Sequence, residues 1–308
     1  MKSSILFKEY TRLVSNNRWS LQQIVFLGTL ISLVINYLSS GMVHQISGNP
    51  LVDQEIDPTY WLAMILRLPA IFRGTLAIVL DSILFLSCLA SLFIPNQTYS
   101  TRIFFIAHFL FFILYNLYSG HHYINIGILI MSFPFVFKTN ERFTAGFTFC
   151  RFLFCFMLFS AALWKIWRGN LTHFDQGSTL LLLQFKSLLF QESSFQYKTI
   201  LFFAQNRMMG QLLWLGMIGI ELLFFWGFIT YKKDNWLLIG HLLFFAGGWF
   251  FFDLYFYENL LFLITLYPVL KGINNLKRKV LREKQHPTAL SNLASGVPLP
   301  DERSSSRH

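Results

Sequence analysis

The sequence predicts an all-α membrane protein, a multi-pass helical bundle with about eight transmembrane helices and one or two interfacial helices. Of its 308 residues, 54% are hydrophobic and only 13% are charged, and the mean hydropathy is +0.49. A soluble domain is also about half apolar, but about a quarter of its residues are charged. The shortage of charge, together with long apolar runs, therefore indicates an integral membrane protein.

Eight apolar runs are candidates for membrane spans, because a helix needs about 20 residues to cross a bilayer core. The segments near 60–72 and 178–190 are apolar but too short or interrupted to cross, so we expect interfacial or re-entrant helices there. The last two of the eight runs are short and could form one broken hairpin. The eight runs are 21–40, 73–94, 102–119, 122–138, 143–167, 209–230, 235–252 and 255–270.

Loop charge predicts a plasma (cytoplasmic) membrane protein with both termini cytoplasmic. Residues 1–20 form a basic N-terminus, which lacks the short apolar core of a cleaved signal peptide. Basic residues also follow the last span and mark the inner loops, whereas the 41–60 loop has three acids and no Lys or Arg. The loops 41–60 and 168–208 are then outside. Residues 271–308 are basic and then rich in Pro and Ser, which predicts a disordered cytoplasmic tail.

The net charge of +10 and the eight histidines suggest nucleic-acid or metal binding, and the sequence argues against both. The basic residues gather at the termini and in short loops, as membrane topology requires, so nucleic acid is not an expected partner. The close histidine pair is His121-His122, and neighbours on a helix point about 100° apart. No HExxH, Walker A or GxSxG motif occurs. Cys88, Cys150 and Cys155 lie in apolar runs and are expected to fill the core.

Lys165 is the most informative residue, because it lies near the end of the almost wholly apolar run 143–167. At 1.5 Å per residue it is about 33 Å along this span, at the outer interface. An ionisable group within a span suggests function. A lysine beside Trp164 and Trp167 can instead extend its amine to the interface within an aromatic belt. Both interpretations stay open at this point.

Polar residues of a neighbouring pair of spans fall at the same outer depth as Lys165. His121 and His122 follow the tight Ser119-Gly120 turn, and Asn125 shares the His122 side of the next helix, one turn on. The sequence therefore predicts that His122, Asn125 and Lys165 come together at the outer face.

A second polar group is predicted deeper in the bundle. Arg151 lies about 12 Å up its span and Glu221 about 16 Å down the next, which makes an Arg151–Glu221 ion pair plausible as a tie between helices. Asp81 has no obvious partner in the sequence. His108 and His241 fall in the inner half, where a lone histidine is more often a satisfied core residue than a ligand. We expect Arg151, Glu221, Asp81 and His241 to be structural buried polar residues.

Three short motifs between about 60 and 270 carry a family resemblance. They are Phe-Ser-Ala-Ala-Leu-Trp-Lys-Ile-Trp at 159–167 followed by Asp-Gln-Gly at 175–177, Gly-His-His-Tyr-Ile-Asn at 120–125, and Glu-Leu-Leu-Phe-Phe at 221–225 with a later His241. Together they resemble the membrane half of the vitamin K-dependent gamma-glutamyl carboxylases. The wider family has the horizontally transferred transmembrane (HTTM) domain, so the resemblance implies an HTTM-like membrane domain over 21–270.

The resemblance implies a carboxylase-like membrane enzyme, a lyase. In the carboxylases a lysine deprotonates the vitamin K hydroquinone, whose oxygenation yields a stronger base that removes a γ-proton from a peptide glutamate before CO₂ adds. Lys165 would be this base and His122 would steady a charged intermediate. The substrate or cosubstrate would contact His121, Asn125, Trp164 and Trp167. A reduced quinone of the vitamin K type is then the implied cosubstrate. The implied partners are a lipidic quinone from the bilayer and a small secreted peptide from outside.

Departures from the family pattern keep a second function open. His121 stands where the carboxylases have an asparagine, and Trp164 replaces a second lysine. The large soluble domain that follows the membrane part of the carboxylases is not expected in this sequence. The alternative is a non-enzymatic membrane factor for export, maturation or immunity of a secreted peptide. A transporter is less favoured, because no internal repeat is visible.

Overall fold

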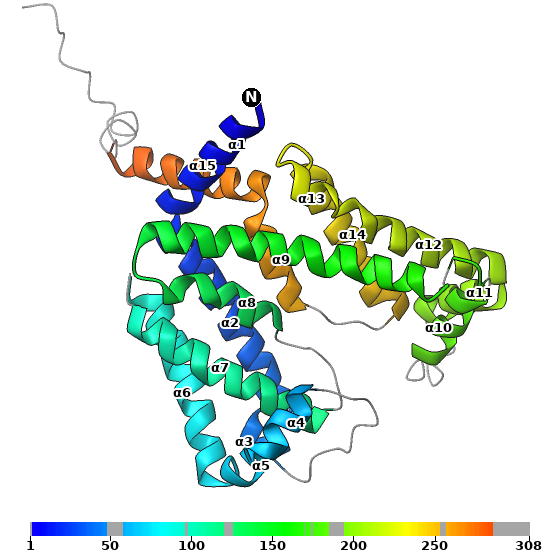
Figure 1. Ribbon diagram of the computed structural model, residues 1–308, viewed down its shortest axis with the longest axis horizontal. Coiled ribbons are helices and arrows are strands. Elements are labelled where there is room, and N and C mark those ends of the chain that lie inside the picture. The colour runs from blue at the N-terminus through cyan, green and yellow to red at the C-terminus, as the bar shows by residue number, and fades with distance from the viewer. Residues whose placement is uncertain are drawn as a thin grey trace, which may run out of the picture.

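The computed structural model describes residues 2–47, 58–95, 98–119, 126–169, 171–173, 175–184, 194–252 and 257–285. These residues are helical with no strand among them, so the predicted all-α class is confirmed. Six of their helices are long and apolar enough to cross a membrane (Figure 1). They are α2 (Arg18–Leu38), α6 (Thr75–Phe93), α7 (Thr98–Ser119), α9 (Asn140–Trp167), α14 (Asp234–Phe252), and α12 (Arg207–Leu223) continued by α13 (Trp226–Ile229).

The predicted number of about eight spans is wrong for the described residues, which contain six long helices. In the run 122–138 the described helix is α8 (Ile126–Ser132), which tightens into the 3₁₀ helix η1 (Phe133–Val136) at Pro134. A proline removes a backbone donor and its ring clashes with the preceding turn, so the α-helix stops there. In the run 255–270 the chain forms the 3₁₀ helix η3 (Tyr257–Thr265) and restarts as α15 (Tyr267–Gln285), with Pro268 in the first turn.

Each of the two shortened segments nevertheless ends at the level where the preceding long helix begins. The hydroxyl of Thr101, in the first turn of α7, donates to the carbonyl of Phe135 in η1 at 2.8 Å. Asp234, the first residue of α14, accepts from the backbone N–H of Tyr267, two residues after η3, at 2.9 Å. The chain therefore returns to the same end of the bundle after α7 and again after α14.

Both terminal helices lie at this end of the bundle (Figure 1). The Tyr10 hydroxyl of α1 (Lys2–Asn16) donates to the carbonyl of Thr265 at 3.0 Å, and the Lys277 amine of α15 donates to the carbonyl of Asn16 at 3.1 Å. Burial raises the pKa of the Tyr10 hydroxyl well above its ordinary value, so it remains a donor at physiological pH. The helices α1 and α15 are thus held at the same side of the bundle, and we name this side the terminal-helix end.

Short helices complete the described part. They fall on both segments that the sequence predicts to be interfacial. The basic residues from 271 belong to α15, and the Pro- and Ser-rich remainder of the tail lies outside the described residues. The short helices are α3 (Val43–Ile46), α4 (Pro58–Ile65), α5 (Leu68–Ile71), α10 (Gln176–Gln184), α11 (Phe195–Gln205) and α13 (Trp226–Ile229).

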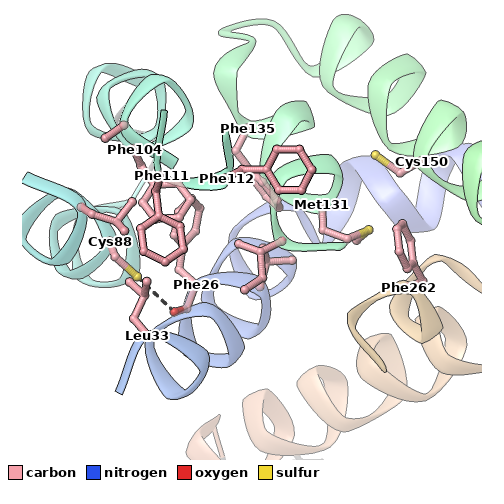
Figure 2. Packing of buried hydrophobic residues seen from close by; sticks show 14 of the residues in the cluster. Phe26, Leu33, Cys88, Phe104, Phe111, Phe112, Met131, Phe135, Cys150 and Phe262 are labelled. Atoms are coloured by element: carbon pink, nitrogen blue, oxygen red, sulfur yellow. Dashed lines mark hydrogen bonds between the residues drawn. The ribbon is translucent and has the colours of Figure 1, made fainter. Parts of the chain in front are cut away.

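The buried apolar residues form two clusters. The larger one joins α1, α2, α6, α7, α8, η3 and the first part of α9. Figure 2 shows its centre, where the Phe26 ring packs edge-on against Phe104 at 5.2 Å. All three cysteines are buried and unpaired, as the sequence predicts, and the Cys88 thiol donates to the carbonyl of Phe26 at 3.5 Å. The smaller cluster lies at the far end of α9 and includes Ala162, Leu181 and Trp214 from α9, α10 and α12.

Candidate functional site

An amine–carboxylate pair joins α9 to α12 inside the smaller cluster. Lys165 Nζ donates to Glu221 Oε1. The Glu221 side chain is 2% exposed and the Lys165 side chain is 22% exposed, so one partner is buried and the other reaches the surface. The second carboxylate oxygen of Glu221, Oε2, is buried and makes no hydrogen bond within the described part of the chain. The pair is therefore accessible from the lysine side and leaves one acceptor unused.

Trp214 is a third residue of this site, because its ring contacts the Lys165 amine. The Lys165 amine lies 4.9 Å from the centroid of the Trp214 ring, a cation–π contact. Trp214 and Glu221 are seven residues apart on α12, so they lie on the same face two turns from each other. The amine is thus held between a carboxylate and an indole.

Helix α10 packs across the outer part of α12 and positions this site. A Cβ atom on Gly177 would lie 2.1 Å from the carbonyl oxygen of Gly210, and one on Gly210 would lie 2.5 Å from Ser178 Oγ. The two backbones therefore approach as closely as they do only because both positions are glycine. This crossing brings Leu181 of α10 into the cluster with Trp214.

The resemblance implies that Trp164 and Trp167 contact the substrate or cosubstrate, which stays a prediction, and the structure places both side chains on the surface. Their exposed fractions are 54% and 82%, and the Arg168 guanidinium lies over the Trp164 ring at 4.7 Å. These exposures fit an aromatic belt at the membrane interface. The tryptophan beside the amine is Trp214, which is not among the residues predicted from the sequence. Its seven-residue spacing from Glu221 is the signal that would have found it.

The other predicted residues of the outer site are His121, His122 and Asn125. All three lie outside the described residues, between α7 and α8. Their predicted approach to Lys165 stays a prediction.

The predicted Arg151–Glu221 pair is wrong, because each residue has another partner. Arg151 Nη2 lies 2.7 Å from Asp234 Oδ1, and its Nη1 donates to the carbonyl of Gly227 at 2.6 Å. The physical reason is the packing of α9 against α13, which follows α12: Gly227 of α13 is so close to Cys155 of α9 that a Cβ would lie 2.3 Å from its sulfur. Arg151 therefore faces the turn beyond α12. Its guanidinium also lies 4.1 Å above the Tyr231 ring, consistent with the predicted structural role.

Asp81, which had no evident partner in the sequence, is paired in the structure. Its Oδ2 lies 2.7 Å from His44 Nδ1 and accepts from the His44 backbone N–H at 2.9 Å. Its Oδ1 accepts from the backbone N–H of Val43 at 3.3 Å. Asp81 thus fastens α3 to α6. The sequence could not show this contact, because the two residues are far apart in the chain.

The two inner histidines pack against aromatic rings. His241 is 2% exposed and meets Phe154 edge-on at 4.9 Å, and His108 is buried and stacks on Phe104 at 5.3 Å. The contacts of His241 fit its predicted structural role. Among the described residues, no group of three or more His, Cys, Asp or Glu side chains could hold a metal ion.

Comparison with family models, with curated proteins and with solved structures gives no match for this chain. The class of protein therefore follows from the fold and the site alone. The chain is an all-α, multi-pass membrane protein with a buried carboxylate paired to a partly exposed lysine amine, at the far end of α9 from the terminal helices.

Proposed function

We propose that this protein is a membrane enzyme resembling the HTTM family and the vitamin K-dependent gamma-carboxylases, with Lys165 as the base. The observation that supports this most is the contact between Lys165 and Glu221. The two residues come from two of the three motifs that carry the resemblance, 56 positions apart in the sequence. An amine and a carboxylate in direct contact at a poorly hydrated site can exchange a proton.

The chemistry needs a neutral lysine amine. When the shared proton lies on Glu221, both groups are uncharged and the Lys165 nitrogen has a free lone pair. The Lys165 lone pair can then take a proton from a weakly acidic hydroxyl of a bound cosubstrate. The nitrogen gains that proton, the O–H electron pair stays on the oxygen, and the resulting ammonium and oxyanion attract each other. A reduced quinone supplies such a hydroxyl, and its anion reacts with oxygen.

The placement of the site suits a lipidic cosubstrate and a peptide substrate. Basic residues gather at the terminal-helix end, where Arg18 donates to the carbonyl of Lys138 at 2.9 Å. By the positive-inside rule this end is cytoplasmic, so Lys165, near the opposite end of α9, faces the extracytoplasmic side of the cytoplasmic membrane. A lipidic molecule would reach the pair from the bilayer, and a small secreted peptide would reach it from outside.

The test is substitution of Lys165 by arginine, followed by mass spectrometry of peptides secreted by cells with wild-type or variant protein. We expect Lys165→Arg to abolish any mass shift that depends on this protein, while its amount in the membrane stays near normal. Arginine keeps the charge but cannot give up its proton at accessible pH. The matched control is Lys198→Arg, at an exposed lysine of α11, which should behave as wild type. Wild-type modification by Lys165→Arg would refute the proposal.

One observation favours the non-enzymatic alternative. The Lys165 amine already has a carboxylate and an indole as partners, as it would in a purely structural tie between α9 and α12. The protein would then act as a membrane factor for export, maturation or immunity of a secreted peptide. Arginine should be tolerated at position 165 in that case.

A further inference from the structure

An apolar groove runs between α12 and α14 on the membrane-spanning part of the protein. It encloses about 620 Å³ and is lined by apolar residues that include Leu213, Gly216, Ile220, Leu243 and Gly247. This volume lies within the usual range for small-molecule sites in proteins, which is roughly 300–1,000 Å³. The groove is therefore large enough to hold a ligand.

Small residues create the hollow. A Cβ atom on Gly216 would meet nothing within 4 Å, and one on Gly247 would lie 3.4 Å from the sulfur of Met217. Larger neighbours form the edges and remain exposed, with Leu243 at 57% and Trp249 at 52%. Since both helices are candidate spans, these exposed edges face the hydrocarbon of the bilayer. A hollow there forfeits dispersion contacts unless a chain fills it.

The groove lies at the depth of the Lys165–Glu221 pair. Its lining on α12 extends from Leu212 to Ile220, the residue before Glu221. Met217 lines the groove and also belongs to the buried cluster that contains Trp214, whose ring contacts the Lys165 amine. Met217 thus links the lining of the groove to the buried cluster that surrounds Trp214. An amphiphile lying in the groove would have its polar end within reach of the pair.

We propose that this groove binds the hydrocarbon tail of the cosubstrate, a membrane-soluble amphiphile whose small polar head is presented to Lys165. The inference rests on the proposed function and specifies where the hydrocarbon tail of the cosubstrate binds. The lining is apolar, so the groove itself offers nothing to a polar head, and the nearby polar groups belong to the pair. Burial of the tail in the groove sets the depth of the head in the membrane. The hydrophobic effect is sufficient for this, because it requires no directional contacts.

The experiment uses two photoactivatable probes on the whole protein in lipid nanodiscs. One is a prenyl quinone with a diazirine and an alkyne on its tail, and the other is a phosphatidylcholine with the same groups on one acyl chain. Crosslinked peptides are identified by mass spectrometry. In the variant Gly216→Leu a leucine side chain occupies the groove, and it meets no clash because a Cβ at Gly216 has nothing within 4 Å. Gly219→Leu is the matched control on the same helix. A Cβ at Gly219 also meets nothing within 4 Å, but this residue does not line the groove.

We expect the quinone probe to label residues of the groove, such as Leu213 and Leu243, in preference to the phosphatidylcholine probe. Gly216→Leu should lower this labelling by roughly fourfold to fifteenfold, because a leucine side chain displaces one or two methylenes of tail. Gly219→Leu should leave it within about twofold. Gly247→Ala, a smaller intrusion into the groove, provides an intermediate variant if Gly216→Leu does not fold.

Three outcomes would overturn the inference. Equal labelling by both probes would mean that the groove holds bulk lipid only. Labelling unchanged by Gly216→Leu would place the tail elsewhere. A second copy of the chain crosslinked through the groove would make it a dimer interface. None of these depends on turnover, so failure of Lys165 as a base, measured with Lys165→Arg, remains distinguishable from failure of the groove.

Discussion

At the residue scale, the structural and chemical contributions of Lys165 and Glu221 can be separated by removing one or both. Lys165→Met should destabilise the protein by about 3 kcal/mol or more, because it leaves the 2% exposed Glu221 carboxylate without its partner. Lys165→Met with Glu221→Met should recover most of that loss, since two apolar side chains of similar length replace the pair. The measurement is thermal unfolding in detergent, together with the peptide mass-shift assay.

The double variant distinguishes the two functions. We expect it to be stable and inactive, because the proton-accepting group is gone while the packing is kept. A stable double variant that still supports peptide maturation would assign the pair a structural role only.

The Arg151–Asp234 pair is governed by the same physics, but we expect no chemistry from it. Arg151→Leu should lower the amount of folded protein, since Asp234 would be left buried without its guanidinium. Adding Asp234→Asn should recover part of the loss and keep an acceptor for the Tyr267 N–H. The amount is measured by fluorescence-detected size exclusion. No difference between the single and double variants would mean that the pair contributes nothing to stability.

At the element scale, the crossing of α10 over α12 sets the walls of the site. Gly→Ala in an exposed helix normally stabilises by up to about 1 kcal/mol. Gly177→Ala should instead destabilise by about 1–3 kcal/mol and loosen α10, because the new methyl would lie 2.1 Å from the carbonyl oxygen of Gly210. Limited proteolysis between α10 and α11, together with thermal unfolding, measures both effects.

Gly219→Ala is the control for this crossing. It lies on α12, where a Cβ has open space, so the substitution should leave stability unchanged or slightly raised. Equal losses from Gly177→Ala and Gly219→Ala would show that the close approach of α10 to α12 is not what matters.

At the scale of the whole molecule, the terminal-helix end should be cytoplasmic. Single cysteines in place of Ser47, after α3, and Thr172, after α9, should react with an impermeant maleimide added to intact cells. A cysteine in place of Lys233, beside the terminal-helix end, should react only after permeabilisation. The charge distribution is the reason, because basic residues concentrate at that end. The three native cysteines are buried, so the background should be low.

The reverse labelling pattern would mean that the protein has the opposite orientation in the membrane, with Lys165 on the cytoplasmic side. A secreted peptide could not then reach the lysine from outside. Both the enzymatic proposal and its substrate class would need revision.

The sequence by itself determined the class of this protein, because low charge and long apolar runs leave a helical membrane bundle as the consistent fold. It also singled out Lys165, since a charge near the end of an apolar run is visible without knowing its neighbours. It overcounted the long spans, because hydropathy does not register how Pro134 shortens one run or how the chain restarts at Tyr267 in another. These are local backbone effects on otherwise apolar segments.

Only the tertiary structure decided which charges meet. Depth along each helix suggested that Arg151 faces Glu221, but depth does not specify the register between two helices. The close packing of Gly227, in α13 just after α12, against Cys155 of α9 constrains that register. In this register Arg151 forms an ion pair with Asp234, and Glu221 forms one with Lys165. Likewise, nothing local to Asp81 indicates His44, because their contact depends on how α3 folds back onto α6. Pairing across helices depends on packing between segments distant in sequence, and periodicity within a single helix carries no information about it.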